Sequence, residues 1–354
     1  MFWPRSDLIE LLGVAHPIIQ APMASASTPA LAAAVTNASG LGSLGCAQMT
    51  PDQVRKNVTA LRALTDGPFN LNFFVHKEPD LDAQALNRAR ARIEPYYTES
   101  GLDDVPEVSV PYPSFNQDKL DVLLDLQPPV VSFHFGLPEP EAVAALKDSG
   151  AVILSSATTV AEARLLAAAG ADAIIAQGQE AGGHRGTFEE PFEAGMVGTM
   201  ALVPQVVDAV DVPVIAAGGI ADGRGIAAAF DLGASGAQIG TAFLPCPESS
   251  ADDTYRAALR NGRDDMTRIT RVISGRPARS LRNRLIDEMA DYQKDVAPFP
   301  SQTSLSAPLR NANRNDPSQL RSLWSGQAVA LNREMSAGDL TLALVDEARR
   351  ILER

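Results

Sequence analysis

Eight short apolar runs in residues 17–244 alternate with alanine-rich stretches whose apolar residues have helical spacing. The runs are PIIQAP (17–22), LGSLGC (41–46), FNLNFFV (69–75), PVVSFHF (129–135), AVILSSA (151–157), ADAIIAQ (171–177), VPVIAAG (212–218) and GAQIGTA (236–242). They are rich in Val, Ile and Ala without strict alternation, which is typical of parallel strands buried on both faces. Eight strand–helix units in series predict an α/β protein with a (β/α)8 TIM barrel. An open doubly wound sheet, the alternative, would more often carry its glycine-rich fingerprint at the first strand.

Three segments lie outside this alternation. Residues 77–116 are charged and contain prolines, which predicts an extended loop and a helix above the barrel. Residues 246–310 are polar and have helical spacing as far as APFPSQTSLSAPLR, so we expect a small helical lid that covers the substrate. Residues 311–354 end in an amphipathic helix, LTLALVDEARRILER, expected to pack back on the barrel. The barrel itself is expected to occupy residues 1–245.

Charge and cysteine usage exclude several classes of function. The net charge of −13 argues against binding to nucleic acid or to anionic membrane surfaces, which requires a basic face. The two cysteines, Cys46 and Cys246, are far apart, so they indicate neither a disulfide framework nor a metal site and favour a reducing compartment. No apolar run approaches the ~18 residues that cross a bilayer, and the first residues lack a signal-peptide core. We therefore expect a cytoplasmic protein without a bound metal.

Two glycine-rich turns, AAGGIADGRG (216–225) and QIGTAFL (238–244), follow the last two apolar runs. Glycine lets backbone N–H groups approach a phosphate closely, and the N-terminus of the helix expected near Asp222 favours negative charge. Phosphate sites in barrels are frequently built from the loops after these two strands. We therefore predict that the turns with Gly218 and Gly219 and with Gly240 and Thr241 bind a phosphate.

The stretch QGQEAGGHRGTFEEP (177–191) follows the sixth run and combines an amide, two glycines and a histidine. Gln177 can bridge donors and acceptors of a heterocycle, and Gly182 and Gly183 bring main chain close to the barrel mouth. His184 has an ordinary pKa of ~6.5, which suits a base or a hydrogen-bond donor to an anion. In the alternative interpretation the histidine caps its loop through a nearby glutamate. Its position beside two glycines on an active-site loop favours the catalytic interpretation.

Other polar residues near strand ends have two interpretations. Asn72 could hydrogen bond a flavin or nucleotide ring, or satisfy loop backbone. His134 could line the substrate pocket, or be a core histidine with satisfied partners. Cys46 is expected to be buried and structural because no base accompanies it, and His16 and His76 are expected at the surface. The chain has no HExxH, no CxxC and no Ser–His–Asp order, so hydrolytic and zinc chemistry have no visible carrier.

Motifs spread over almost the whole chain resemble one family. They are QAPMA, GLGSLG, NFF, SFHFG, QGQEAGGHRG, AAGGIADGRG, QIGTAFL, SGRPAR and LWSGQ, in chain order. Together they resemble the flavin-dependent nitronate monooxygenases, formerly called 2-nitropropane dioxygenases. EAGGHRG (180–186) resembles the class that carries a histidine above the flavin.

The resemblance implies an FMN-binding barrel that oxidises alkyl nitronates with O2, through one-electron transfer to FMN, to a carbonyl compound and nitrite. Propionate 3-nitronate would be the expected substrate. His184 would face the nitro group or α-carbon of the substrate, with His134 and Phe299 in the substrate pocket. Ala21, Pro22 and Met23 would back the flavin ring, and Asn72 and Gln177 would hydrogen bond it. The residues that would follow the flavin to its phosphate are Gly182, Gly183, Gly218, Gly219, Gln238, Ile239, Gly240 and Thr241.

One segment departs from the family pattern. Some members carry a tyrosine where this chain has Phe299, followed by aromatic and lysine residues where Thr303 and Ala307 stand here. Hydroxyl and ammonium groups that could hold a carboxylated substrate are therefore absent from those positions. Arg310 or Arg276 could compensate.

Two other functions stay open at the level of sequence. An FMN-dependent NAD(P)H reductase of quinones or enoyl thioesters shares the APM and GG elements, and the GGHRG histidine discriminates against it. A non-catalytic binder of FMN or of a phosphorylated ligand would not need His184. The protein is expected to be a monomer or a homodimer.

Overall fold

The computed structural model describes residues 2–189, 191–312, 316 and 318–354. Within them, eight parallel strands form one sheet in the order β1-β9-β8-β6-β5-β4-β3-β2. The strands are β1 (Ile18–Gln20), β2 (Gly42–Gly45), β3 (Phe69–Phe74), β4 (Val130–His134), β5 (Val152–Ala157), β6 (Ala173–Gln177), β8 (Val214–Ala217) and β9 (Gly236–Ile239). A parallel bridge between Ile19 and Leu41 joins the two edges of the sheet. The eight apolar runs therefore form a (β/α)8 barrel, as predicted.

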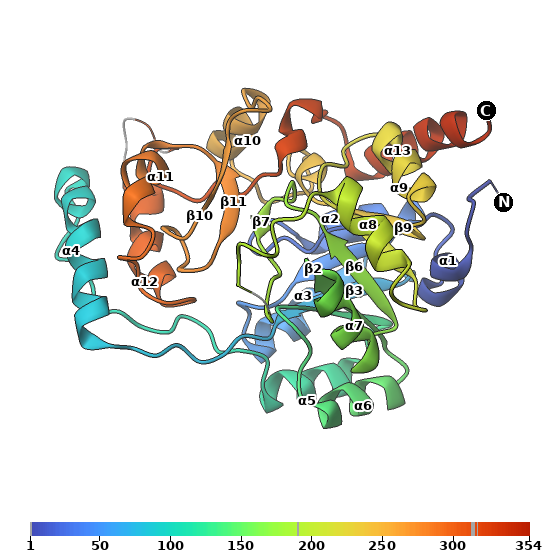
Figure 1. Cartoon of the computed structure of the whole chain (residues 1–354), viewed down its shortest axis with the longest axis horizontal. Coiled ribbons are helices and arrows are strands. Elements are labelled where there is room, and N and C mark those ends of the chain that lie inside the picture. Colours follow the sequence, from blue (N-terminus) through green and yellow to red (C-terminus); the bar gives the residue numbers. More distant parts are fainter. Residues whose placement is uncertain (1, 190, 313–315, 317) are drawn as a thin grey trace.

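The helices between these strands cover the outside of the barrel (Figure 1). They are α2 (Pro29–Asn37), α3 (Pro51–Arg62), α5 (Gln117–Leu126), α6 (Pro140–Asp148), α7 (Val160–Ala168), α8 (Thr199–Val207) and α9 (Gly223–Asp231). Side-chain caps fix where they begin. Thr28 Oγ1 accepts the N–H of Leu31 ahead of α2, and Asp222 accepts the N–H groups of Arg224 and Gly225 ahead of α9.

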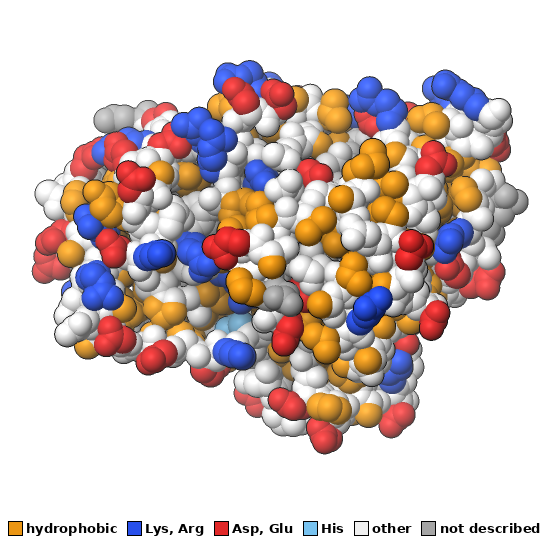
Figure 2. Space-filling view, viewed as in Figure 1, with side chains coloured by type: hydrophobic (Ala, Val, Ile, Leu, Met, Phe, Trp, Pro, Cys, Tyr) orange, Lys and Arg blue, Asp and Glu red, His pale blue; other side chains and the backbone are white. Residues whose placement is uncertain are grey.

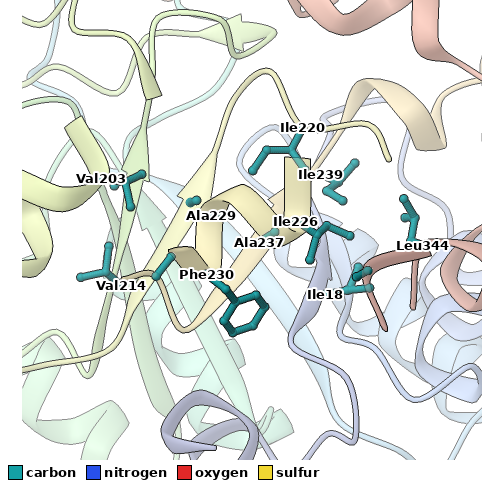
Figure 3. Close-up of a cluster of buried hydrophobic side chains, with 14 of the residues drawn as sticks. Ile18, Val203, Val214, Ile220, Ile226, Ala229, Phe230, Ala237, Ile239 and Leu344 are labelled. Carbon is teal, nitrogen blue, oxygen red and sulfur yellow. The ribbon is translucent and has the colours of Figure 1, made fainter. Parts of the chain in front are cut away.

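Apolar side chains fill two layers, the interior of the barrel and the space between its sheet and the helices. Leu154 and Ile175 belong to the interior layer. Figure 3 shows part of the outer layer, in which Ile226 of α9 and Ile239 of β9 are buried in one cluster. Strands that are covered on both faces explain why the apolar runs do not alternate.

The two ends of the described chain also pack on the barrel. Leu8 and Leu12 of α1 (Asp7–Leu12) belong to the interior cluster, so α1 closes the amino-terminal end of the barrel. The last helix, α13 (Ala337–Leu352), contacts α2 and α9 from outside, with Leu340 and Leu344 fully buried. The expectation that the C-terminal helix returns to the barrel agrees with this packing.

A second unit lies beside the carboxyl-terminal end of the barrel and is built from two distant parts of the sequence. In Figure 1, α4 (Ala83–Ser100) stands beside α11 (Arg284–Glu288) and α12 (Gln302–Ser306). Tyr97 of α4 donates its hydroxyl to the carbonyl oxygen of Leu305, at 2.7 Å, and both side chains belong to one buried cluster. We call this unit, residues 77–116, 246–312 and 318–325, the lid.

The lid is only partly helical, which corrects the sequence prediction. It contains α10 (Asp253–Arg260), α11 and α12, but β10 (Thr267–Thr270) and β11 (Ala278–Leu281) form an antiparallel hairpin where helical spacing was expected. On its other side β11 pairs with β7 (Gly183–His184), so β11 is the central strand of this sheet. The segments of β10 and β11 therefore form strands and not a helix, because β11 exchanges backbone hydrogen bonds with the barrel loop that carries His184.

Residues 318–325, assigned to the C-terminal region by sequence, pack on residues 280–283 and so belong to the lid. Asn283 donates to the carbonyl oxygens of Ser318 and Arg321, at 2.9 and 2.8 Å, and Ser280 forms a bridge with Trp324. On the face drawn in Figure 2, acidic and basic side chains are interspersed over the lid and the barrel. Among the described helices, none combines the length and the hydropathy that crossing a membrane requires.

Candidate active site

A cavity of about 450 Å³ opens at the carboxyl ends of the barrel strands. Its walls come from residues that follow β1, β6, β8 and β9, from side chains of β3 and β4, and from the lid. This is the end of a barrel at which active sites are built. Its size is within the range of small-molecule and cofactor sites.

Most residues predicted from sequence line this cavity. Those that do are Ala21, Pro22, Met23, Asn72, His134, Gln177, Gly182, Gly183, His184, Gly218, Gly219, Gln238, Gly240 and Thr241. Ile239 is not among them, because alternate side chains of a strand point to opposite faces and its own side chain is buried in the outer core. Phe299 is not among the lining residues either, but its ring packs against that of His184, with centroids 5.3 Å apart.

The turns after β8 and β9 form a cradle of free backbone N–H groups. Gly218 and Gly219 have φ angles of 113° and 72°, which a side chain would strain. The N–H groups of Gly218, Gly219 and Gly240 donate to no acceptor among the described residues. A cluster of unpaired N–H groups ahead of a helix N-terminus fits a phosphate.

Two amide side chains at the cavity have unused acceptors. Gln238 Oε1 is buried and has no partner among the described residues. Asn72 donates to Ser132, at 2.9 Å to Oγ and 3.2 Å to the carbonyl oxygen, which leaves Asn72 Oδ1 as an acceptor. A buried acceptor without a donor is costly, so these oxygens fit a cofactor that brings hydroxyl and ring N–H donors.

Arg185 holds the loop after β6 in place and is the largest fully buried side chain described. Its guanidinium donates to Gln177 Oε1 and O, to Gly178 O and to Gly195 O, at 2.6–3.0 Å. Gln177 Oε1 also accepts the N–H of Gly186, and its Nε2 donates to the carbonyl oxygen of His184 at 3.0 Å. Gln177 is therefore mainly a clamp on this loop, with one amide hydrogen left for a cofactor.

His184 is fixed both through its ring and through its main chain. Its Nε2 lies 2.9 Å from Ser274 Oγ, and its carbonyl oxygen accepts from Gln177 and from His134. Ser274 Oγ also donates to the carbonyl oxygen of Arg276 at 3.2 Å, so the direction of the hydrogen bond between Ser274 and His184 depends on the tautomer of the ring. In the tautomer that carries the proton on Nδ1, this atom has no partner among the described residues and can donate to a ligand.

Burial lowers the pKa of His184 to about 3, and the charges of His134, Arg276 and His76 act in the same direction. The imidazole is therefore neutral at pH 7. The ordinary histidine pKa assumed from sequence does not apply at this position.

His134 satisfies both interpretations made from sequence, because it lines the cavity and both its ring nitrogens have partners. Its Nε2 lies 3.1 Å from the carbonyl oxygen of His184, which can only accept, so Nε2 carries the proton. Its Nδ1 then accepts from Ser156 Oγ at 2.9 Å. Burial lowers the pKa of His134 to about 3, so this ring is a neutral support for the His184 loop.

An aromatic wall that sequence analysis did not assemble surrounds His184. The rings of Phe74, Phe299 and Trp324 lie 5.9, 5.3 and 5.4 Å from the histidine ring, measured between centroids. His76, expected at the surface, is buried against Phe299 at 5.0 Å. The NFF and LWSGQ motifs contain two of these residues, but no local signal joins them to Phe299.

Two further sequence expectations concern Cys46 and the arginines. Cys46 is completely buried, as expected for a structural cysteine, and burial raises the pKa of its thiol to about 12.

The Arg276 guanidinium stacks on the Phe135 ring at 3.8 Å and donates to the carbonyl oxygen of Thr187. Arg310 lines the cavity. The structure therefore separates the two arginines that were candidates for substrate binding.

The fold and the cradle define the general class first: this is an α/β-barrel protein whose cavity, at the carboxyl ends of the strands, has a cradle of free N–H groups suited to a phosphate. The family model of nitronate monooxygenase matches residues 5–347. The chain is similar to the nitronate monooxygenase of Paraburkholderia phytofirmans, with 44% identity over 354 residues, which cover 99% of this chain and 97% of that protein. The chain belongs to the nitronate monooxygenase family, a family of flavin-dependent oxidoreductases.

Solved structures agree with this assignment. A structure described as nitroalkane oxidase from Streptomyces ansochromogenes is 40% identical, has a TM-score of 0.89 and covers 99% of this chain and 100% of its own. FabK from Thermotoga maritima is 32% identical, with a TM-score of 0.74 and coverage of 99% and 97%.

Proposed function

We propose that the protein is an FMN-dependent enzyme that uses O2 to oxidise alkyl nitronates to a carbonyl compound and nitrite, with propionate 3-nitronate as the expected substrate. The observation that carries this proposal is His184, a buried neutral histidine fixed at the mouth of a barrel that has a phosphate cradle. The family relationship supports nitronate oxidation. A cytoplasmic location and a monomeric or homodimeric state belong to the same proposal.

The chemistry that FMN supplies when bound is acceptance of an electron from the nitronate and its transfer to O2. The free N–H groups of Gly218, Gly219 and Gly240 would hold the phosphate. The unpaired oxygens of Gln238 and Asn72 would accept hydrogen bonds from the cofactor. These residues would position and orient the cofactor in the cavity.

His184 suits a substrate that already carries a negative charge. A nitronate is an anion, and its oxygens accept the Nδ1 hydrogen of a neutral imidazole. A neutral nitroalkane would first have to lose a carbon-bound proton, and a histidine with a pKa of about 3 is too weak a base for that step near pH 7. We therefore propose that nitronates are used directly.

The lid contributes by excluding water from the reacting atoms. Phe299 and Trp324 of the lid, together with Phe74 of β3, surround the His184 ring. A hydrogen bond from His184 to a nitronate oxygen is stronger in such a site than in water.

The visible spectrum of the purified protein, recorded without oxygen before and after addition of propionate 3-nitronate, tests the proposal. We expect bound flavin whose oxidised absorbance decreases with the nitronate and returns on admission of oxygen, with release of nitrite. A flavin spectrum that responds to NADH and not to the nitronate would favour a reductase of quinones or enoyl thioesters. A flavin spectrum unaffected by either would favour a non-catalytic binder, and absence of flavin would contradict the cofactor assignment.

A further inference from the structure

Lys119 of α5 is a buried cation to which the proposed mechanism assigns no task. The residue is 4% exposed, and its ammonium donates to the carbonyl oxygens of Ala47, Pro113 and Ser114, at 3.1, 2.8 and 3.3 Å. An ammonium has three N–H donors, so these carbonyls use all of them. Among the described residues, no carboxylate pairs with Lys119 and no other donor reaches the three oxygens. Main-chain oxygens therefore hold this charge.

The three carbonyls belong to two segments that meet at the cavity. Ala47 follows β2 of the barrel and precedes Gln48. Residues 113–114 belong to the lid and follow Tyr112. Gln48 and Tyr112 both line the cavity. Lys119 therefore fastens the barrel to the lid directly beside two residues of the cavity wall.

Tyr112 connects this wall to the catalytic histidine. Its buried ring lies 6.2 Å from that of Phe299, and the Phe299 ring lies 5.3 Å from that of His184, measured between centroids. Buried rings are closely packed, so a shift of one ring is transmitted to its neighbours. The position of Tyr112 therefore affects the aromatic wall around the His184 ring.

Only the charged form of the amine can satisfy all three carbonyls. Burial lowers the pKa of Lys119 from 10.5 to about 8. Above that pH the amine of the folded protein is neutral and has two N–H donors, so one carbonyl oxygen loses its partner. A buried acceptor without a donor is costly, so the segment that carries it is expected to move.

The titratable groups around Lys119 keep one form near this pH. Its charge acts on Cys46 and His76, and burial raises the pKa of the Cys46 thiol to about 12 and lowers the pKa of His76 to about 4. Burial also raises the pKa of Tyr112 to about 12. No described charged group of α3 or α6, the helices that pack on α5, acts on the pKa of Lys119. A proton released near pH 8 in this part of the molecule is therefore that of Lys119.

We propose that Lys119 is a positioning residue: its protonated amine holds Gln48 and Tyr112 in the cavity wall, so that the active site is complete only while the amine carries its charge. The inference rests on the proposed function and adds a pH limit to it. Release of the proton loosens the lid segment at residues 113–114 and weakens binding of the nitronate, so it raises KM more than it lowers kcat.

Steady-state oxidation of propionate 3-nitronate by the flavin-loaded enzyme, from about pH 6 to about pH 10, tests the inference. We expect wild-type kcat/KM to fall through a one-proton step near pH 8, mainly because KM rises. Lys119→Met should lower kcat/KM at pH 7 by about 10-fold and remove the step. Lys147→Met is the matched control and should keep the wild-type profile, because Lys147 also donates to a carbonyl oxygen, that of Gly170, but at the amino-terminal end of the barrel strands.

Hydrogen exchange of the flavin-loaded proteins separates this inference from the proposed function, because it does not depend on turnover. The N–H of Phe115, bonded to the carbonyl oxygen of Phe74, and the N–H of Met49, bonded to that of Cys46, report on the two segments. After correction for the intrinsic effect of pH on exchange, we expect both amides of the wild type to be less protected at pH 9 than at pH 7. In Lys119→Met the protection should be low at both pH values. If the nitronate is not oxidised, the proposed function fails and exchange still decides the role of Lys119.

Three results would overturn the inference: a wild-type profile without a step near pH 8, a step that persists in Lys119→Met, or unchanged protection of both amides in that variant. If Lys119→Met does not yield folded protein, the pH profile and the exchange of the wild type decide.

Discussion

Replacing Arg185 by methionine removes the clamp that positions the catalytic loop while keeping much of the side-chain volume. The guanidinium donates four hydrogen bonds, and two of the acceptors, Gly178 O and Gln177 Oε1, keep a backbone N–H donor without it. The loss therefore falls mainly on Gln177 O and Gly195 O. Hydrogen bonds to a charged group contribute roughly 1.5–3 kcal/mol each, so we expect Arg185→Met to lower the free energy of unfolding by about 4 kcal/mol.

Urea unfolding of the flavin-loaded protein, at one fixed flavin concentration, measures this change, because bound ligand itself adds to stability. Arg164→Met, on the exposed face of α7, is the matched control and should stay within about 0.5 kcal/mol of wild type. Arg185→Lys keeps the positive charge but cannot reach four acceptors, so it should recover little of the loss. A change below about 1 kcal/mol in Arg185→Met, or full recovery in Arg185→Lys, would refute the argument from the guanidinium fork.

Three further substitutions test other parts of the site. His184→Asn should keep its flavin and lower kcat for nitronate oxidation by about 10²-fold; unchanged turnover would reduce the residue to a structural role. Gly219→Val should yield flavin-free protein, because the positive φ is strained and the phosphate cradle is blocked, whereas Gly13→Val, at a similar φ away from the site, should retain flavin; the ratio of flavin to protein absorbance decides. His76→Phe removes two buried ring nitrogens that have no hydrogen-bond partner among the described residues, so the free energy of unfolding should rise by about 1–2 kcal/mol at pH 7. Folding lowers the pKa of His76 from 6.5 to about 4, so between these pH values the unfolded chain binds more protons than the folded one, and the stability of the wild type falls on acidification. His76→Phe should reduce this fall between pH 7 and 5 by about 2 kcal/mol. If urea unfolding gave the same dependence of unfolding free energy on pH for both proteins, the prediction would be contradicted.

The barrel could be predicted from the sequence because its signals are local and repeated. Each strand is a short apolar run, and caps such as Thr28 and Asp222 mark where the next helix begins. In a barrel the carboxyl ends of all strands converge, so Asn72, Gln177 and Gly218 could be expected at one cavity without knowledge of their contacts.

The lid could not be predicted in the same way. Tyr97 and Leu305 are 208 positions apart, and no local pattern relates them. The TRIT and ARSL segments are too short for their periodicity to separate a strand from a helix, and pairing with the loop that carries His184 decides between them.

The sequence by itself determined the barrel, the glycine turns of the cradle and the position of His184 on a loop at the barrel mouth. Tertiary structure alone decided the charge state of that histidine, since burial and the nearby cations lower its pKa to about 3. It also decided that Arg310 faces the cavity while Arg276 stacks on Phe135. Strand and helix signals arise from neighbours along the chain, whereas desolvation and Coulomb interactions depend on distances in space that only the folded lid and barrel define.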